Sequence, residues 1–210
     1  MKKTCVFLVV FLAICVVLPA STQVNFGVLG GLNLANISMD PDEGLDFSNR
    51  TAFGFGVVLD YSLNESITLH LEPMYLQKGT NVEFSFWGEK YKMEIIAANL
   101  EIPVMLKNAF GTADIKPYVM AGPIIGFNLS AKAKNNGVAE EDIKDYIKNV
   151  EFGLGFGAGV NLPMGNNSIF LETCYAFGLT NVNDGLNPGT DIKTKGLQIF
   201  VGITFPTGKK

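Results

Sequence analysis

The chain has 210 residues, of which 17% are charged and 23 are glycine, and its formal net charge is −4. This length predicts a single folded domain. The small charged fraction and the absence of any basic run argue against a nucleic-acid partner.

The first 20 residues have the pattern of a secretory signal peptide. Two lysines near the start precede an unbroken apolar run from Cys5 to Leu18, and small residues follow that run. A run this short, with these flanks, is typical of a cleaved signal rather than of a membrane anchor. We therefore expect a signal peptide at 1–20 and one domain at 21–210.

The remainder alternates apolar and polar residues in eight segments, with no helical block between them. A period of two is the pattern of a β-strand with two different faces. In the second segment, for example, Phe53 and Phe55 lie on one face and Gly54 and Gly56 on the other. The expected strands are about 24–37, 51–63, 66–78, 91–107, 115–131, 150–162, 168–181 and 195–205.

The segment 150–162 has the most unequal faces. One face is apolar throughout, whereas the other carries little besides glycine. A glycine face weakens a water-exposed strand, but it suits the inside of a narrow closed barrel, where side chains compete for space. The apolar face would then point into lipid, and the glycines would leave room for the inward side chains of other strands: His70, Met74, Tyr118 and Met120.

The connections between these segments alternate in length. Those after the first, third, fifth and seventh strands are long, and the other three are short. This asymmetry is typical of outer-membrane barrels, which have short periplasmic turns and longer external loops. We expect loop structure at 79–90, a short amphipathic helix at 138–148, and aromatic girdles near the strand ends, formed by Phe26, Tyr61, Tyr75, Tyr118 and Phe205.

Four prolines fall inside the expected strands: Pro73, Pro103, Pro117 and Pro123. Proline removes a hydrogen-bond donor from the ladder, and a closed barrel has no free edge to accommodate it. Since Pro73 and Pro103 lie on neighbouring strands, we expect a bulge or another irregularity there.

Two stretches in the middle of the chain carry a family resemblance. NLEIPVMLK (99–107) and KPYVMAGPIIGFNLSAK (116–132) resemble the central hairpin of the PorT-like outer-membrane β-barrel family of Bacteroidetes-type bacteria. YAFGLTNV (175–182) and LQIFVGITF (197–205) resemble its last two strands. The resemblance implies an all-β fold, an eight-stranded antiparallel up-and-down barrel in the bacterial outer membrane, like small OmpA/OmpX-type barrels. It implies little chemistry.

Four ionisable residues are expected to point inward at similar heights in the lower half of the barrel: His70, Glu72, Glu101 and Glu172. Acids gathered in a narrow lumen can mark a functional site. They can equally form a structural polar plug, hydrogen-bonded to Tyr118, Gln198 and Asn99, because small barrels fill their interiors in this way. We favour the plug, in which Lys78 and Lys107 lie near the strand ends as the few basic partners.

Other chemistries are poorly supported by the sequence. The single histidine is too little for a metal site, which needs about three or four converging ligands. No motif places Ser168 or Thr68 against His70 as a nucleophile, and Gly153-Leu154-Gly155 has no helix after it to form a dinucleotide site. We therefore expect no catalytic residues, no metal and no cofactor.

The predicted protein is an integral outer-membrane barrel without enzymatic activity that acts structurally or through its external loops. Its partners would be outer-membrane lipid and an extracellular or periplasmic protein, with the barrel itself a monomer. Three alternatives remain: a narrow pore or a transport or secretion accessory, a lipid-modifying outer-membrane enzyme, and a soluble lipocalin-like barrel with inverted faces.

Overall fold

A computed structural model describes residues 24–41, 45–86, 89–111, 115–135, 140–185 and 188–207. The expected signal peptide at 1–20 lies outside these residues. Within them, no helix has the length and apolar character needed to cross a membrane. The elements are β1 (Val24–Asp40), β2 (Asp46–Ser48), β3 (Arg50–Ser62), β4 (Ile67–Leu71), β5 (Met74–Phe86), β6 (Glu89–Ala109), β7 (Lys116–Asn135), β8 (Glu141–Asp142), the 3₁₀ turn η1 (Lys144–Tyr146), β9 (Val150–Met164), β10 (Asn167–Gly178) and β11 (Asp191–Pro206).

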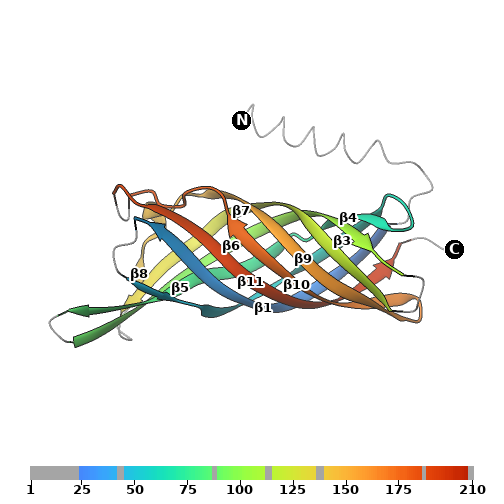
Figure 1. Ribbon diagram of the computed structural model, residues 1–210, viewed down its shortest axis with the longest axis horizontal. Helices are drawn as coiled ribbons and strands as arrows, with labels where there is room; N and C mark the ends of the chain where they lie inside the picture. The colour runs from blue at the N-terminus through green and yellow to red at the C-terminus, as the bar shows by residue number, and fades with distance from the viewer. Residues whose placement is uncertain are drawn as a thin grey trace, which may run out of the picture.

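The long strands close into a ring of eight, in which β4 and β5 together form the third wall strand. Each long strand pairs antiparallel with its neighbour in the chain, and β1 closes the ring by pairing with β11, with Phe26 opposite Phe205. Figure 1 shows the tilted strands wrapping around a single axis. The prediction of an eight-stranded antiparallel barrel is confirmed.

The two faces of each strand are distributed as the alternation predicts. Val28, Phe55 and Leu171 point outward and are 52, 56 and 51% exposed, whereas Leu29 and Val58 point inward and are 5 and 0% exposed. Such a continuous apolar belt would promote aggregation in water, but it is the surface that a hydrocarbon layer solvates. The barrel is therefore built to sit in a membrane.

The glycines of β9 form a thin wall against which bulky side chains pack. A methyl group at Gly155 would lie 2.5 Å from Cε of Met105, and one at Gly157 would lie 2.7 Å from Cε of Met120. At Gly159 it would overlap the ring of Tyr118. The expected use of this wall as room for Tyr118 and Met120 is confirmed, and Met105 is a third occupant.

The chain irregularity expected at Pro73 is present as a break in the third wall strand. β4 ends at Leu71 and β5 begins at Met74. The N–H of Glu72 donates to the carbonyl of Pro103 at 3.2 Å, and the N–H of Val57 donates to the carbonyl of Pro73 at 3.0 Å, so the ladder resumes in the same register.

A second irregularity lies higher on β6, where the register with β7 shifts between Ala98 and Asn99. The bulge turns Ala98 inward, where it is 7% exposed, because a bulge resets the alternation of one strand. The expectation that Ala98 faces lipid is therefore wrong.

Two connections differ from the sequence expectation. The segment 79–90 is a continuation of β5 and β6 as a paired hairpin rather than a loop, with Trp87 outside the described residues. It extends beyond the rest of the barrel at the end opposite the chain termini (Figure 1). The helix expected at 138–148 is wrong in its described part, because 141–142 pair with β7 as β8 and only the short turn η1 follows.

The expected girdle position of Tyr118 is also wrong. Its side chain is 1% exposed and lies inside the barrel, because it falls on the inward face of β7. The pair of Phe26 and Phe205, with ring centroids 5.4 Å apart, does lie at the end of the wall near the short turns.

Candidate functional site

The half of the barrel nearer the short turns encloses a group of ionisable side chains, which we name the lower cluster. Its members come from six positions around the wall, and none is more than 7% exposed. The period of two places each on the inward face of its strand. The lower cluster consists of Asp60 (β3), His70 (β4), Glu72 (between β4 and β5), Lys107 (β6), Tyr118 (β7) and Glu172 (β10).

His70 lies at the centre of the lower cluster, with both ring nitrogens directed at acids. Nδ1 contacts Oδ1 of Asp60 on the neighbouring strand. Nε2 lies 2.8 Å from Oε1 of Glu72 and 3.8 Å from Oε2 of Glu172. The edge of the ring packs against Phe170. The imidazole is thus surrounded by three carboxylates.

Tyr118 and Lys107 complete the lower cluster. The hydroxyl of Tyr118 donates to Oε2 of Glu172 at 2.7 Å. Nζ of Lys107 lies 3.8 Å from Oδ2 of Asp60 and 3.9 Å from the ring centroid of Tyr118. This buried ammonium therefore combines an ion pair with a cation–π contact.

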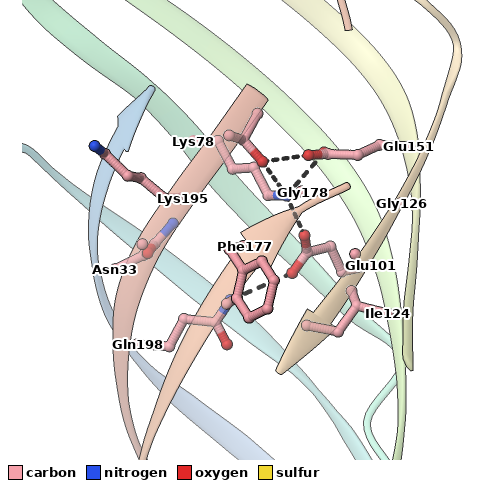
Figure 2. Close-up of a pocket in the computed structure, with 14 residues that line it drawn as sticks. Asn33, Lys78, Glu101, Ile124, Gly126, Glu151, Phe177, Gly178, Lys195 and Gln198 are labelled. Atoms are coloured by element: carbon pink, nitrogen blue, oxygen red, sulfur yellow. Dashed lines mark hydrogen bonds and ion pairs between the residues drawn. The ribbon is translucent and has the colours of Figure 1, made fainter. Parts of the chain in front are cut away.

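A second group lies further toward the long-loop end, and we name it the upper cluster. Nζ of Lys78 contacts Oε1 of Glu101 and lies 3.0 Å from Oε2 of Glu151. Thr194 contacts the other oxygen of Glu151, and Nε2 of Gln198 donates to Oε2 of Glu101 at 3.3 Å. Figure 2 shows Lys78 lying between the two carboxylates, with Gln198 beneath them.

Apolar side chains fill the barrel between the two clusters. Met105 lies opposite His70 in the strand register, and Glu101 follows four residues further along β6, about 13 Å along the strand. The intervening space is packed by buried side chains from several strands, including Met74, Met105, Ile124, Cys174 and Phe200. The described interior is therefore layered as polar, apolar and polar.

The structure brings together three of the four residues expected to form an inward cluster. His70, Glu72 and Glu172 belong to the lower cluster, with donor atoms that all lie within 4.8 Å of one another. Glu101 is buried but belongs to the upper cluster. Of the expected hydrogen-bond partners, Tyr118 and Gln198 contact acids, whereas Asn99 accepts from Asn128 instead.

Sequence reasoning missed four members of the two clusters: Asp60, Lys78, Lys107 and Glu151. The inward alternation of β3 and β9 did carry a signal for the two acids, since each is the charged residue on a face that otherwise bears glycine or valine. The expectation that the two lysines lie near strand ends is wrong for Lys78, because β5 continues to Phe86. Both lysines are buried partners of the acids.

Above the upper cluster, the long-loop end contains a mainly apolar cavity of about 630 Å³, mouth included. Its floor is formed by Lys78, Glu151 and Thr194, and its walls include Ile37, Ile147, Val182 and Ile192. A smaller space of about 330 Å³, partly open, surrounds the upper cluster itself (Figure 2).

Short pairings order the connections around this end. β2 pairs with β5, β8 pairs with β7, and Ile147 bridges to Asn183. The ammonium of Lys132 donates to the carboxylate of Glu140 at 2.7 Å, and this hydrogen bond lowers the pKa of that carboxyl. The described outer connections are therefore built structure.

The chemistry that the lower cluster offers is that of converging carboxylates on one imidazole. A hydrolase arrangement would require a hydroxyl nucleophile on one ring nitrogen and an acid on the other. Here both nitrogens are directed at acids, so neither Ser168 nor Thr68 occupies the nucleophile position. The arrangement resembles a ligand set more closely than a triad.

Comparison with known proteins identifies the family. The family model of the outer membrane protein beta-barrel domain matches residues 19–184. The chain belongs to this family. Its location is the bacterial outer membrane, which agrees with the apolar outer belt.

Solved structures give the same fold. OprG from Pseudomonas aeruginosa is 11% identical, with a TM-score of 0.51, and the match covers 90% of this chain and 96% of that one. Neisserial surface protein A, from Neisseria, is 17% identical (TM-score 0.46; 86% and 96% covered). Ail, the attachment invasion locus protein of Yersinia pestis, is 17% identical (TM-score 0.39; 88% and 97% covered). No curated protein matches the chain.

Proposed function

We propose that this outer-membrane barrel works without catalysis, by supporting the membrane structurally and by contacting other molecules through its external connections. The packed interior carries the proposal. Two polar clusters and an apolar layer occupy the barrel, which leaves the outer connections as the part that a large partner can reach. In this proposal the barrel is a monomer surrounded by lipid, and its partner is an extracellular or periplasmic protein.

Within the broader family, the sequence segments described above favour a position near the PorT-like barrels. That placement concerns ancestry, and a role in secretion does not follow from it. The external connections support a surface role because β2, β8 and the β5–β6 hairpin project from the wall as ordered structure (Figure 1).

A comparison of surface-binding phenotypes tests the proposal. A strain lacking the gene is complemented with wild-type protein or with a variant whose hairpin 82–92 is replaced by a two-residue turn. We expect the shortened variant to reach the outer membrane in normal amount but to lose the adhesion of wild-type cells to protein-coated surfaces. Full adhesion by the shortened variant, with the other connections also removable, would count against a surface role.

Two measurements separate the alternatives. A pore would give stable, reproducible unit currents in planar bilayers, whereas a packed barrel gives none. A lipid-modifying enzyme that uses His70 would leave altered lipid in cells carrying His70→Asn, whereas our proposal expects unchanged lipid. Appearance of either signal would replace the proposal by the corresponding activity.

A further inference from the structure

We infer that His70, Glu72 and Glu172 form a binding site for one divalent transition-metal ion, with Zn²⁺ as the best-matched species. The site lies inside the lower half of the barrel and is separate from the surface role proposed above. It rests on the geometry of the three side chains, on their unpartnered atoms and on the groups behind them.

The three side chains offer donor atoms around a common point. Nε2 of His70 lies 2.8 Å from Oε1 of Glu72 and 3.8 Å from Oε2 of Glu172, and all donors lie within 4.8 Å of one another. Zinc binds nitrogen and oxygen at roughly 2.0–2.2 Å in tetrahedral geometry, which separates ligands by about 3.4 Å. Small rotations of the two glutamates would therefore complete the coordination.

Each of the three residues also directs an unsatisfied atom at this point. Nε2 of His70, Oε1 of Glu72 and Oε1 of Glu172 have no hydrogen-bond partner, although their side chains are at most 4% exposed. A buried polar atom without a partner is costly, and two carboxylates directed at one point repel each other unless a proton or a cation lies between them. A metal ion there would satisfy all three atoms together.

The groups behind the ligands are arranged as in known metal sites. Asp60 contacts Nδ1 of His70, which assigns the proton to that nitrogen and leaves the lone pair of Nε2 directed at the site. The hydroxyl of Tyr118 donates to Glu172 and fixes the orientation of that carboxylate. Such outer partners orient ligands and typically account for 10–100-fold in metal affinity.

The charge of the lower cluster also matches a divalent ion. Asp60, Glu72 and Glu172 carry three negative charges, and Lys107 supplies one positive charge at 3.8 Å from Asp60. With His70 neutral, two negative charges remain uncompensated in the cluster. Buried charge is costly without a partner, so a dication is the species that balances these groups.

The donor types select the class of metal. An imidazole with two carboxylates suits Zn²⁺ and related transition metals, whereas Ca²⁺ and Mg²⁺ prefer oxygen ligands alone. The ion would join β4 to β10, which lie on opposite sides of the ring. It would thus brace the barrel across its axis, beside the strand break at Pro73.

Metal content of the refolded mature protein tests the inference. The barrel is refolded in detergent with ZnCl₂ or with a chelator, dialysed, and analysed by elemental mass spectrometry, with Co²⁺ as a spectroscopic probe. We expect about one zinc ion per folded chain, as for a structural site, and Co²⁺ absorption bands of a four-coordinate centre. A zinc content no higher than that of an unrelated barrel would overturn the inference.

Matched variants separate specific binding from adventitious binding. Glu72→Gln should weaken zinc binding at least 100-fold, and Asp60→Asn, behind His70, should weaken it about 10–100-fold. Glu101→Gln removes an equally buried carboxylate from the upper cluster and should retain the affinity. Equal affinities in wild type and Glu72→Gln would refute the site.

A measurement on the wild-type chain covers the case in which variants do not fold. Zinc present during refolding should raise the thermal unfolding temperature relative to chelator-treated protein, because an ion that binds only the folded state stabilises that state. Mg²⁺ at the same concentration should not. Identical unfolding temperatures with zinc and with chelator would again overturn the inference.

Discussion

Nζ of Lys78 on β5 lies 3.0 Å from Oε2 of Glu151 on β9, a strand that does not neighbour β5 in the ring. The same ammonium contacts Glu101 on β6. One cation therefore ties three strands together through the barrel interior. The contact is possible because β9 carries glycine at most of its other inward positions, which allows long side chains to cross the narrow lumen.

Replacing Lys78 by methionine should be strongly destabilising. The change keeps the length of the side chain but leaves Glu101 and Glu151 buried without their cation. Breaking a buried pair in this way typically costs roughly 3–5 kcal/mol. The free energy of unfolding, measured by urea titration of the barrel in lipid vesicles, should fall by about this amount.

Lys132→Met is the matched control, since it removes a lysine whose ion pair with Glu140 is exposed to solvent. Surface pairs contribute little because water and salt screen them. We expect no measurable change in the urea midpoint. Equal losses for the two variants would mean that the upper cluster does not stabilise the barrel.

The glycine wall gives a second prediction, at Gly159. A methyl group there would meet Oη of Tyr118 at 2.5 Å and the carbonyl oxygen of Leu171 at 2.7 Å. Gly159→Ala should therefore displace Tyr118 from Glu172, with a destabilisation of about 1–3 kcal/mol, the usual cost of overpacking. Urea unfolding of the two proteins measures the difference.

Gly126→Ala provides the comparison for this prediction. Gly126 also faces inward, but a methyl group there would have its nearest neighbour at 3.6 Å, an ordinary contact. We expect this variant to be as stable as wild type. A cost at Gly126 as large as that at Gly159 would show that strand geometry, and not the room for Tyr118, fixes these glycines.

A third prediction concerns Gly54 and Leu76, whose strands β3 and β5 pair at this point. A methyl group at Gly54 would lie 2.6 Å from Cδ1 of Leu76, and its other near contacts are ring atoms of Phe200. Gly54→Ala should thus cost about 1–3 kcal/mol and Leu76→Ala about 2–5 kcal/mol. In the double variant the new methyl group occupies part of the space that Leu76 vacates.

The double variant should therefore be more stable than the sum of the two single changes indicates, by about 0.5–3 kcal/mol. A double-mutant cycle from urea unfolding gives this coupling directly. Strict additivity would show that the two side chains do not share space. The backbone position of Gly54 would then be the reason for its glycine.

The direction in which most wall residues point could be predicted from sequence because a pleated strand has only two faces. Glu172, for example, follows from the outward Leu171 on the same strand. Ala98 was misplaced because a bulge resets the alternation, and no residue near it marks the bulge. The hairpin at 79–90 was missed because Gly79 and Asn81 are residues typical of loops.

The candidate site was only partly predictable, for a different physical reason. Which inward residues meet depends on the stagger of the strands around the closed barrel, a property of the whole ring. Glu101 and Glu172 were placed at similar heights from their distances to the turns, yet Glu101 pairs with Lys78 in the upper cluster. The partners of His70 depend on that same stagger, so they required the closed structure.

The orientation of the barrel gives the last prediction. Ser48 lies exposed in β2 at the long-loop end, and Asn166 lies exposed in the turn between β9 and β10 at the other end. In the outer membrane, long loops face outside and short turns face the periplasm. Ser48→Cys should therefore react with a membrane-impermeant maleimide on intact cells, whereas Asn166→Cys should react only after the outer membrane is permeabilised. The native Cys174 is 4% exposed inside the barrel and should not react in either case. Labelling of Asn166→Cys on intact cells, with Ser48→Cys protected, would require the opposite orientation and would place the β5–β6 hairpin in the periplasm.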